Sequence, residues 1–115
     1  MSRAGTEGSA ARRRQHAALF AALGDETRLS LVTTLAAGEP RSIAQLSSGA
    51  RITRQAISKH LRVLQGAGLV HNVRRGRESR FGLEAAPLRE LEDYLHRVSE
   101  QWDQVLARLK AFVES

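Results

Sequence analysis

Hydrophobic residues recur at helical spacing along the first third of the chain. Residues 16–23 carry an apolar cluster, and Leu29, Val32 and Leu35 then recur at the spacing of a second helix, together with Leu31 and Ala36. Asp25 stands directly before this second stretch and is suited to cap it. The pattern therefore predicts two consecutive helices that bury their apolar stripes against a common core.

Two shorter amphipathic segments follow, each preceded by a residue that favours helix N-caps. Ser42 precedes the first segment and Thr53 the second. In the second segment, Leu61 and Leu64 fall within about 40° of Ile57 when each residue advances by about 100°. Two short helices separated by a brief turn are the layout of a helix-turn-helix.

The helical period gives way to an extended pattern after Gly68. Residues 69–74 and 79–83 flank a glycine turn, which predicts a two-stranded hairpin. Pro87 then opens a long helix, which we expect to run over about residues 87–113. The predicted fold is therefore mainly α with a small β-hairpin wing, which is a winged helix-turn-helix.

The last helix carries an unbroken heptad seam. Its apolar residues alternate in steps of three and four: Leu88, Leu91, Leu95, Val98, Trp102, Val105, Leu109 and Phe112. Such a helix is about 40 Å long, whereas a domain of this size is about 30 Å across. We expect dimerisation through the terminal helices, with part of the seam packed inside the protomer. The expected homodimer interface comprises Leu91, Leu95, Val98, Trp102, Val105, Leu109 and Phe112.

The length of 115 residues suits one domain. We place it at residues 12–115, behind a small, polar segment over residues 1–11 that we expect to be disordered. The chain has no cysteine, which excludes disulfides and thiolate metal ligands. No apolar run reaches membrane-spanning length, so we expect no membrane partner and a cytoplasmic location.

The formal net charge is +6, and Lys59 and Lys110 are the only lysines among the 18 basic residues. The placement of the arginines indicates the partner better than their number does. Helix 54–65 gathers side chains that suit base edges and phosphates on one face, and four arginines surround the hairpin turn, where they would repel one another without an anion. The predicted contacts to double-stranded DNA are Thr53, Arg54, Gln55, Ser58, Lys59, Arg62, Arg74, Arg75, Arg77 and Arg80.

Three segments carry a resemblance to a known family. DETRLSLVTTLAAGE, TRQAISKHLRVLQGAGLV and VRRGRESRFGL together resemble the winged-helix repressors of the ArsR/SmtB class over about residues 15–113. The resemblance implies a dimeric bacterial regulator, associated with the nucleoid, that binds operator DNA and usually represses transcription. It also implies that helix 54–65 enters the major groove beside an arginine-rich wing, and that the dimer reads an inverted repeat.

Many members of this class release DNA when they bind a metal, but their ligand patterns are not matched here. The family's cysteine site falls on residues 42–46, where no thiolate is present, and Asp93 and His96 have the wrong spacing for its other site. The chain resembles the cysteine-free, metal-independent branch, so we expect no metal and no cofactor. A metal-responsive repressor with a non-standard site at Asp93, His96 and Glu100 stays open as an alternative, and the effector is unknown.

Two other classes of function fit the sequence less well. An enzyme would need a cysteine nucleophile, a nucleophile elbow, a phosphate-binding glycine loop or a metal triad, and none of these motifs occurs. We therefore expect no catalysis. A winged-helix protein-interaction module stays open as an alternative, although a wing that binds protein has no need of four arginines.

Overall fold

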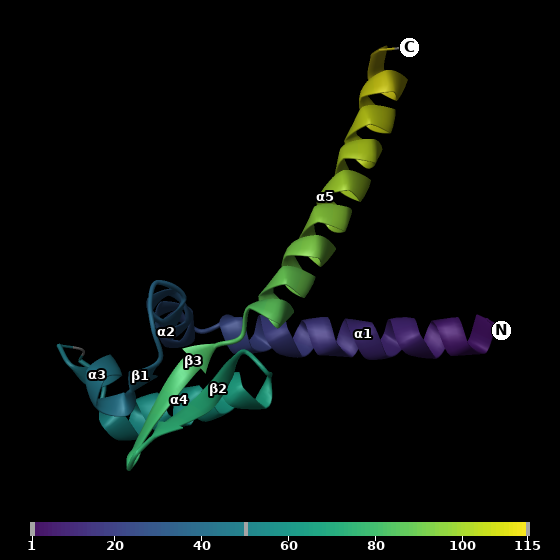
Figure 1. The fold of residues 1–115 in the computed structure, drawn as a ribbon. Helices are drawn as coiled ribbons and strands as arrows, with labels where there is room; N and C mark the ends of the chain where they lie inside the picture. The colour runs from purple at the N-terminus through teal and green to yellow at the C-terminus, as the bar shows by residue number, and fades with distance from the viewer. Residues whose placement is uncertain (1, 50, 115) are drawn as a thin grey trace.

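The computed structural model describes residues 2–49 and 51–114 (Figure 1). The elements in chain order are α1 (Ser2–Leu23), α2 (Glu26–Ala36), β1 (Arg41–Ser42), α3 (Ile43–Ser47), α4 (Arg54–Gly66), β2 (Val70–Arg75), β3 (Glu78–Leu83) and α5 (Ala85–Glu114). A mainly helical chain with a small antiparallel sheet confirms the predicted winged helix-turn-helix fold. The C-terminal part of α1 lies together with α2, α3, α4 and the sheet, whereas the N-terminal half of α1 and most of α5 extend away from them in different directions (Figure 1).

One hydrophobic core connects every helix with the sheet. Its most deeply buried large side chains are Ile57, Leu61 and Leu64 of α4, together with Leu69, which directly precedes β2. Leu91 is the buried residue that α5 contributes. The apolar face of α4 therefore lies at the centre of the domain, and its opposite face is free to meet solvent.

The helix starts follow from local hydrogen bonds that the sequence predicted. The Asp25 carboxylate accepts from the Arg28 amide N–H at 3.0 Å, and the Thr53 hydroxyl accepts from the Ala56 amide N–H at 3.1 Å. Ser42 caps α3 in a reciprocal arrangement with the third residue of that helix. The predicted N-caps Asp25, Ser42 and Thr53 are confirmed.

Two glycines at positive φ end α4 and turn the hairpin. Gly68 has φ of 80°, and the amide N–H of Leu69 donates to the carbonyl of Leu64 at 2.9 Å, which is the Schellman pattern of helix ends. Gly76 has φ of 62° and begins the two-residue loop between β2 and β3. A glycine at the first loop position matches the twist of the two strands.

The sheet has a third strand that the sequence did not reveal. β1 pairs antiparallel with β3, with Arg41 opposite Phe81 and Ser42 opposite Arg80. The prediction of a two-stranded hairpin was therefore incomplete, because a strand of two residues has no alternating pattern to detect. The extra pairing fastens the base of the wing, defined as the β2–β3 hairpin, to the start of α3.

The buried face of α2 differs from the predicted one. Leu31, Val32 and Leu35 are buried, whereas Leu29 is 49% exposed. Two overlapping sets of residues recur at helical spacing in this segment, and the pattern alone cannot choose between them. The predictions for Leu29 and for Ala36, which is also exposed, were wrong, whereas those for Leu31, Val32 and Leu35 are confirmed.

The first helix starts earlier than predicted. The structure continues α1 back to Ser2, where the sequence predicted a disordered segment over residues 1–11. Alanine and arginine favour helices, and extending an existing helix requires no new nucleus. Met1 itself lies outside the described residues.

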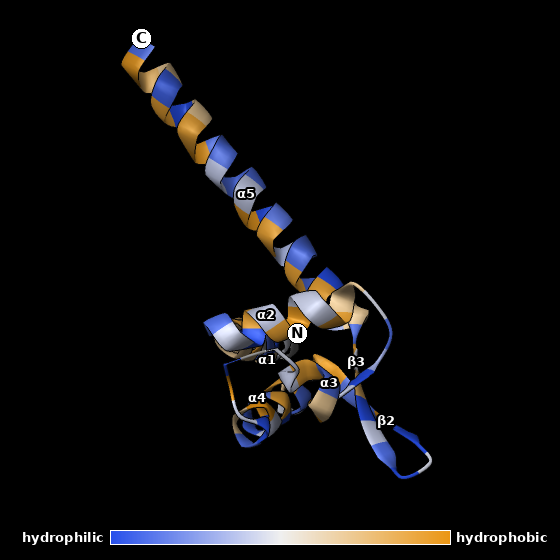
Figure 2. Cartoon of the chain, turned by 90° about the vertical axis from the view of Figure 1, so that its left-hand side faces the viewer, coloured by the Kyte–Doolittle hydropathy of each residue, from blue (hydrophilic) through white to orange (hydrophobic). Residues whose placement is uncertain are grey.

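The last helix extends well beyond the domain core. The radius of gyration is 19.0 Å, whereas a compact chain of this length has about 13 Å. Hydrophobic residues recur along α5 to its end in Figure 2, although the part beyond Leu91 has left the core. Within the described residues, no helix combines the length and hydropathy that crossing a bilayer requires.

Candidate nucleic-acid interface

The helix α4 separates its apolar and polar residues onto opposite faces. Ile57, Leu61 and Leu64 are at most 1% exposed, and they fix which side of the helix faces the core. The predicted DNA-contacting residues of this segment lie on the remaining surface: Thr53, Arg54, Gln55, Lys59 and Arg62 are exposed, and Ser58 is half-buried. None of the six predicted residues of this segment is therefore buried in the core.

The charged side chains of this surface are exposed and are not neutralised by ion pairs within the described residues. Within the described part of the chain, Arg54, Lys59 and Arg62 form no ion pair. Gln55 and Ser58 likewise have no side-chain hydrogen bond among the described residues, so their donors and acceptors face solvent. We define the α4 polar face as Thr53, Arg54, Gln55, Ser58, Lys59 and Arg62.

The wing presents three of its four arginines at its tip. Arg74 and Arg75 end β2, Arg77 lies in the loop, and all three are exposed and form no ion pair within the described residues. Successive strand residues point to opposite faces, so Arg74 and Arg75 place positive charge on both sides of the hairpin. The tip is accordingly among the most hydrophilic parts of the chain in Figure 2.

Arg80 lies apart from these three arginines. It is paired with Val73 on one side and Ser42 on the other, within the three-stranded part of the sheet. Its Nη2 atom lies 3.4 Å from a carboxylate oxygen of Glu78, and its Nε atom is buried without a hydrogen bond. Its guanidinium is therefore partly engaged inside the wing.

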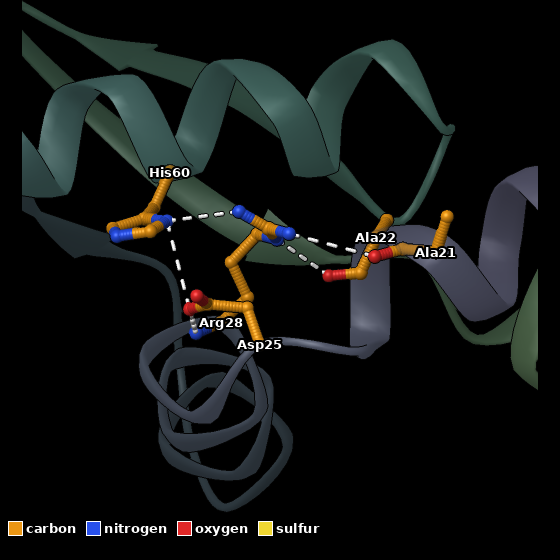
Figure 3. A network of polar contacts seen from close by, with 5 residues as sticks. All are labelled: Ala21, Ala22, Asp25, Arg28 and His60. Carbon is orange, nitrogen blue, oxygen red and sulfur yellow. Dashed lines mark hydrogen bonds and ion pairs between the residues drawn. The ribbon is translucent and has the colours of Figure 1, made fainter.

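A polar network holds α4 against the first two helices (Figure 3). The Arg28 guanidinium donates from Nε to the carbonyl of Ala22 at 2.6 Å, and its Nη1 lies 3.1 Å from Nδ1 of His60. Asp25 lies 3.8 Å from the same His60 nitrogen. The amide N–H of Arg28 is the main cause that lowers the pKa of the Asp25 carboxyl, and the positive charge of the Arg28 side chain acts in the same direction.

Sequence reasoning missed part of this arrangement. Arg28 and His60 are 32 positions apart, so no local pattern indicated their contact. Arg51 is also exposed and lies two residues before the N-cap Thr53, so it adds another cation close in sequence to the α4 polar face. The position of Arg51 in the turn between α3 and α4 could have indicated from the sequence that it belongs with the predicted DNA contacts.

The candidate metal ligands of α5 do not form a cluster. His96 lies 3.5 Å from Glu100 across one helical turn, and both side chains are largely exposed. No group of three or more histidine, aspartate or glutamate side chains suited to a metal occurs among the described residues.

Comparisons with known proteins agree with this geometry. A family described as a helix-turn-helix domain matches residues 23–73. An uncharacterized HTH-type transcriptional regulator, YuzN of Bacillus subtilis, is 38% identical over 80 residues, which cover 64% of this chain and 87% of that relative.

Solved structures give the same result. An ArsR-like transcriptional regulator from Rhodococcus sp. RHA1 is 38% identical, with a TM-score of 0.79 over 89% of this chain and 95% of that chain. Mb0332 of Mycobacterium bovis, described as a homodimeric winged helix-turn-helix DNA-binding domain and a possible ArsR-family regulator, shares the fold at 24% identity. Its TM-score is 0.63 over 85% of this chain and 87% of that one.

These relatives are transcriptional regulators, which confirms the prediction that the chain is not an enzyme. The helix-turn-helix match covers α2 to α4 and reaches into β2, so it includes the α4 polar face. The chain belongs to the ArsR family of winged helix-turn-helix, DNA-binding transcriptional regulators.

Proposed function

We propose that the chain acts as a homodimeric repressor that reads an inverted repeat in duplex DNA. In this proposal α4 enters the major groove and the wing arginines contact the adjacent backbone. The observation that carries it is the α4 polar face, whose charged side chains lie exposed without ion pairs among the described residues. A surface of this kind gains its missing acceptors from phosphates and base edges.

The side chains of the α4 polar face suit direct base reading. Gln55 is able to pair with both major-groove groups of adenine, and Arg54 and Lys59 suit the two acceptors of guanine. The major groove is about 12 Å wide and admits one helix of about this diameter. Because the opposite face of α4 is buried in the core, the helix presents these side chains outward.

The wing suits contacts that do not depend on sequence. Arg74, Arg75 and Arg77 surround a hairpin tip, and each phosphate that an arginine neutralises releases a condensed counterion. Arg80 is partly engaged with Glu78, so we expect it to contribute less than the other three. The wing would thus supply affinity, while the α4 polar face supplies the choice of sequence.

The exposed seam of α5 supports the dimer. Leu95, Val98, Trp102, Val105 and Leu109 are between 40% and 61% exposed, which is unusual for a row of large apolar side chains. An apolar groove of about 540 Å³ lies between α1 and α5 and is lined in part by Phe20, Leu91 and Leu95. A second copy would cover both features, as the homodimeric state of the Mycobacterium bovis relative also suggests.

The proposed dimer gives the interface its geometry on DNA. A two-fold axis presents two copies of α4 to successive major grooves, whose centres are about 34 Å apart along the duplex. A dimer of this size on a promoter would exclude RNA polymerase by occupying the same groove, which is why we favour repression. Such a regulator would act in the bacterial cytoplasm, where the promoters are.

The proposal is tested by selection of preferred duplexes from a random-sequence library, followed by anisotropy titration of the selected duplex and a scrambled one at two salt concentrations. We expect a consensus with two-fold symmetry, and salt-sensitive binding that is about a thousandfold tighter to the selected duplex. Selection without a consensus, with equal weak binding to both duplexes, would contradict base reading and favour a protein-binding winged helix.

A further inference from the structure

We propose that Arg28 and His60 position the recognition helix. Their hydrogen bond fixes the rotation of α4 about its own axis, and so sets the register in which the α4 polar face meets base edges. This inference rests on the proposed reading role of α4 and adds two residues that do not themselves belong to that face.

The Arg28 side chain is hydrogen-bonded to the C-terminal end of α1. Its Nε donates to the carbonyl of Ala22 at 2.6 Å, and its Nη2 donates to the carbonyl of Ala21 at 3.4 Å. Both carbonyls belong to the last turn of α1, where the helix dipole is negative, and the Ala21 carbonyl also accepts from the amide N–H of Gly24 at 3.2 Å. Two donors on one planar group therefore fix both the position and the direction of the guanidinium.

The Arg28 side chain also contacts α4 through His60. The Nη1 atom of the same guanidinium lies 3.1 Å from Nδ1 of His60. Arginine has no acceptor, so His60 Nδ1 must accept, and the neutral ring carries its proton on Nε2. Figure 3 shows the other ring nitrogen turned away from Arg28, and Asp25 approaching Nδ1 from the α2 side.

The hydrogen bond between Arg28 and His60 adds a directional contact to the apolar packing of α4. Ile57, Leu61 and Leu64 hold α4 in the core, but apolar contacts are not directional and tolerate small rotations. A rotation of about 10° moves a group about 5–6 Å from the helix axis by roughly 1 Å. That displacement would take the 3.1 Å contact between Arg28 and His60 beyond hydrogen-bond distance.

The location of His60 makes the same rotation matter for DNA. His60 follows Lys59 directly and stands two residues before Arg62, so the three side chains move together on one rigid helix. A shift of roughly 1 Å would also break bidentate contacts to bases, which depend on the same bond geometry. Contacts to phosphates are less affected, since they do not require one register.

The experiment compares the wild-type chain with three single variants and one double variant, all full-length, on the selected duplex and on a scrambled duplex. His60→Leu removes the acceptor, His60→Asn retains an acceptor near the position of Nδ1, and Arg28→Lys retains the charge without the fork. We expect His60→Leu and Arg28→Lys each to weaken binding to the selected duplex about tenfold, with scrambled binding within about twofold of wild type. We expect His60→Asn to restore most of the loss.

The double variant tests whether the two residues act as a unit. Arg28→Lys with His60→Leu should lose no more affinity than either single change, because both remove the same bond. Equal losses on both duplexes, additive losses, or no rescue by His60→Asn would refute positioning. A wild-type chain that prefers no duplex would refute the proposed function itself, which is a different result from a preference that the variants retain.

A spectroscopic measurement on the wild-type chain tests the bond even where a variant fails to fold. Nitrogen chemical shifts of the His60 imidazole at neutral pH should show a protonated Nε2 and an accepting Nδ1. A ring that is protonated at Nδ1 would overturn the assignment, since that nitrogen would then have no lone pair to accept from Arg28.

Discussion

Trp102 offers the most direct test of the proposed dimer interface. It lies in the middle of the α5 seam, and 61% of its surface is exposed in the single chain. If two copies pair along this seam, the exposed part of each Trp102 is covered by the partner. We therefore expect Trp102→Ala to dissociate the dimer at concentrations where the wild-type chain stays associated.

The magnitude follows from the exposed surface. A tryptophan buries about 150–250 Å² when it is fully covered, so the exposed 61% corresponds to roughly 90–150 Å². At about 25 cal/mol per Å², its burial contributes roughly 2–4 kcal/mol per copy. The two-fold axis doubles this contribution, so truncation weakens association by up to about 4–8 kcal/mol, which is about a thousandfold or more in the dissociation constant.

Sedimentation equilibrium over a wide concentration series measures this change. Arg97→Ala is the matched control, because it truncates another exposed residue of α5 that lies outside the apolar seam. Circular dichroism of both variants reports whether the domain itself stays folded. A Trp102→Ala chain with the wild-type dissociation constant would show that the interface lies elsewhere and that the exposed seam has another purpose.

Four further substitutions test the other parts of the structure. Gln55→Ala should lower discrimination between selected and scrambled duplexes by about 1–3 kcal/mol in anisotropy titrations, and equal losses on both would argue against base reading. Arg75→Ala and Arg77→Ala should each reduce the slope of log binding constant against log salt concentration by about one unit. The control Arg89→Ala on α5 should leave this slope unchanged. An unchanged slope in the wing variants would contradict the proposed phosphate contacts. The pKa of the Asp25 carboxyl is lowered, first of all by the hydrogen bond from the Arg28 amide N–H. The ionised carboxylate therefore stabilises the fold at pH values above the unfolded pKa of about 3.8, and this stabilisation is lost as the pH falls through the folded pKa. Asp25→Asn should therefore flatten the acid limb of stability in urea unfolding at a series of pH values, and parallel curves for the two chains would contradict this.

The features that the sequence predicted correctly depend on neighbouring residues. Asp25, Ser42 and Thr53 cap helices through bonds to residues three positions away, and a window of a few residues contains both partners. The apolar stripe of α4 is equally local, because its period is visible within one helix. These signals were sufficient to order the helices and the hairpin, and therefore to predict the winged helix-turn-helix.

The features that were missed depend on residues that are distant in the sequence. β1 is defined by its pairing with β3 nearly forty positions later, and it has no pattern of its own. Leu29 and Leu31 are equally apolar, and only the placement of α2 against the core decides which is buried. The partial engagement of Arg80 with Glu78 likewise depends on the fold of the wing, so the sequence grouped it with the three arginines of the tip.

The part of α5 that extends beyond the domain core affects how readily the protein is degraded in the cell. Beyond residue 98 the helix has no buried side chain among the described residues, and a segment of about 16 residues is only marginally helical in water by itself. If a partner copy orders this segment, its stability depends on concentration, as for any folded state that requires association. Below the concentration at which the chains pair, single chains would then present a frayed, apolar terminus to proteases, while paired chains would be protected. The supply of regulator would in this way be limited by its own assembly.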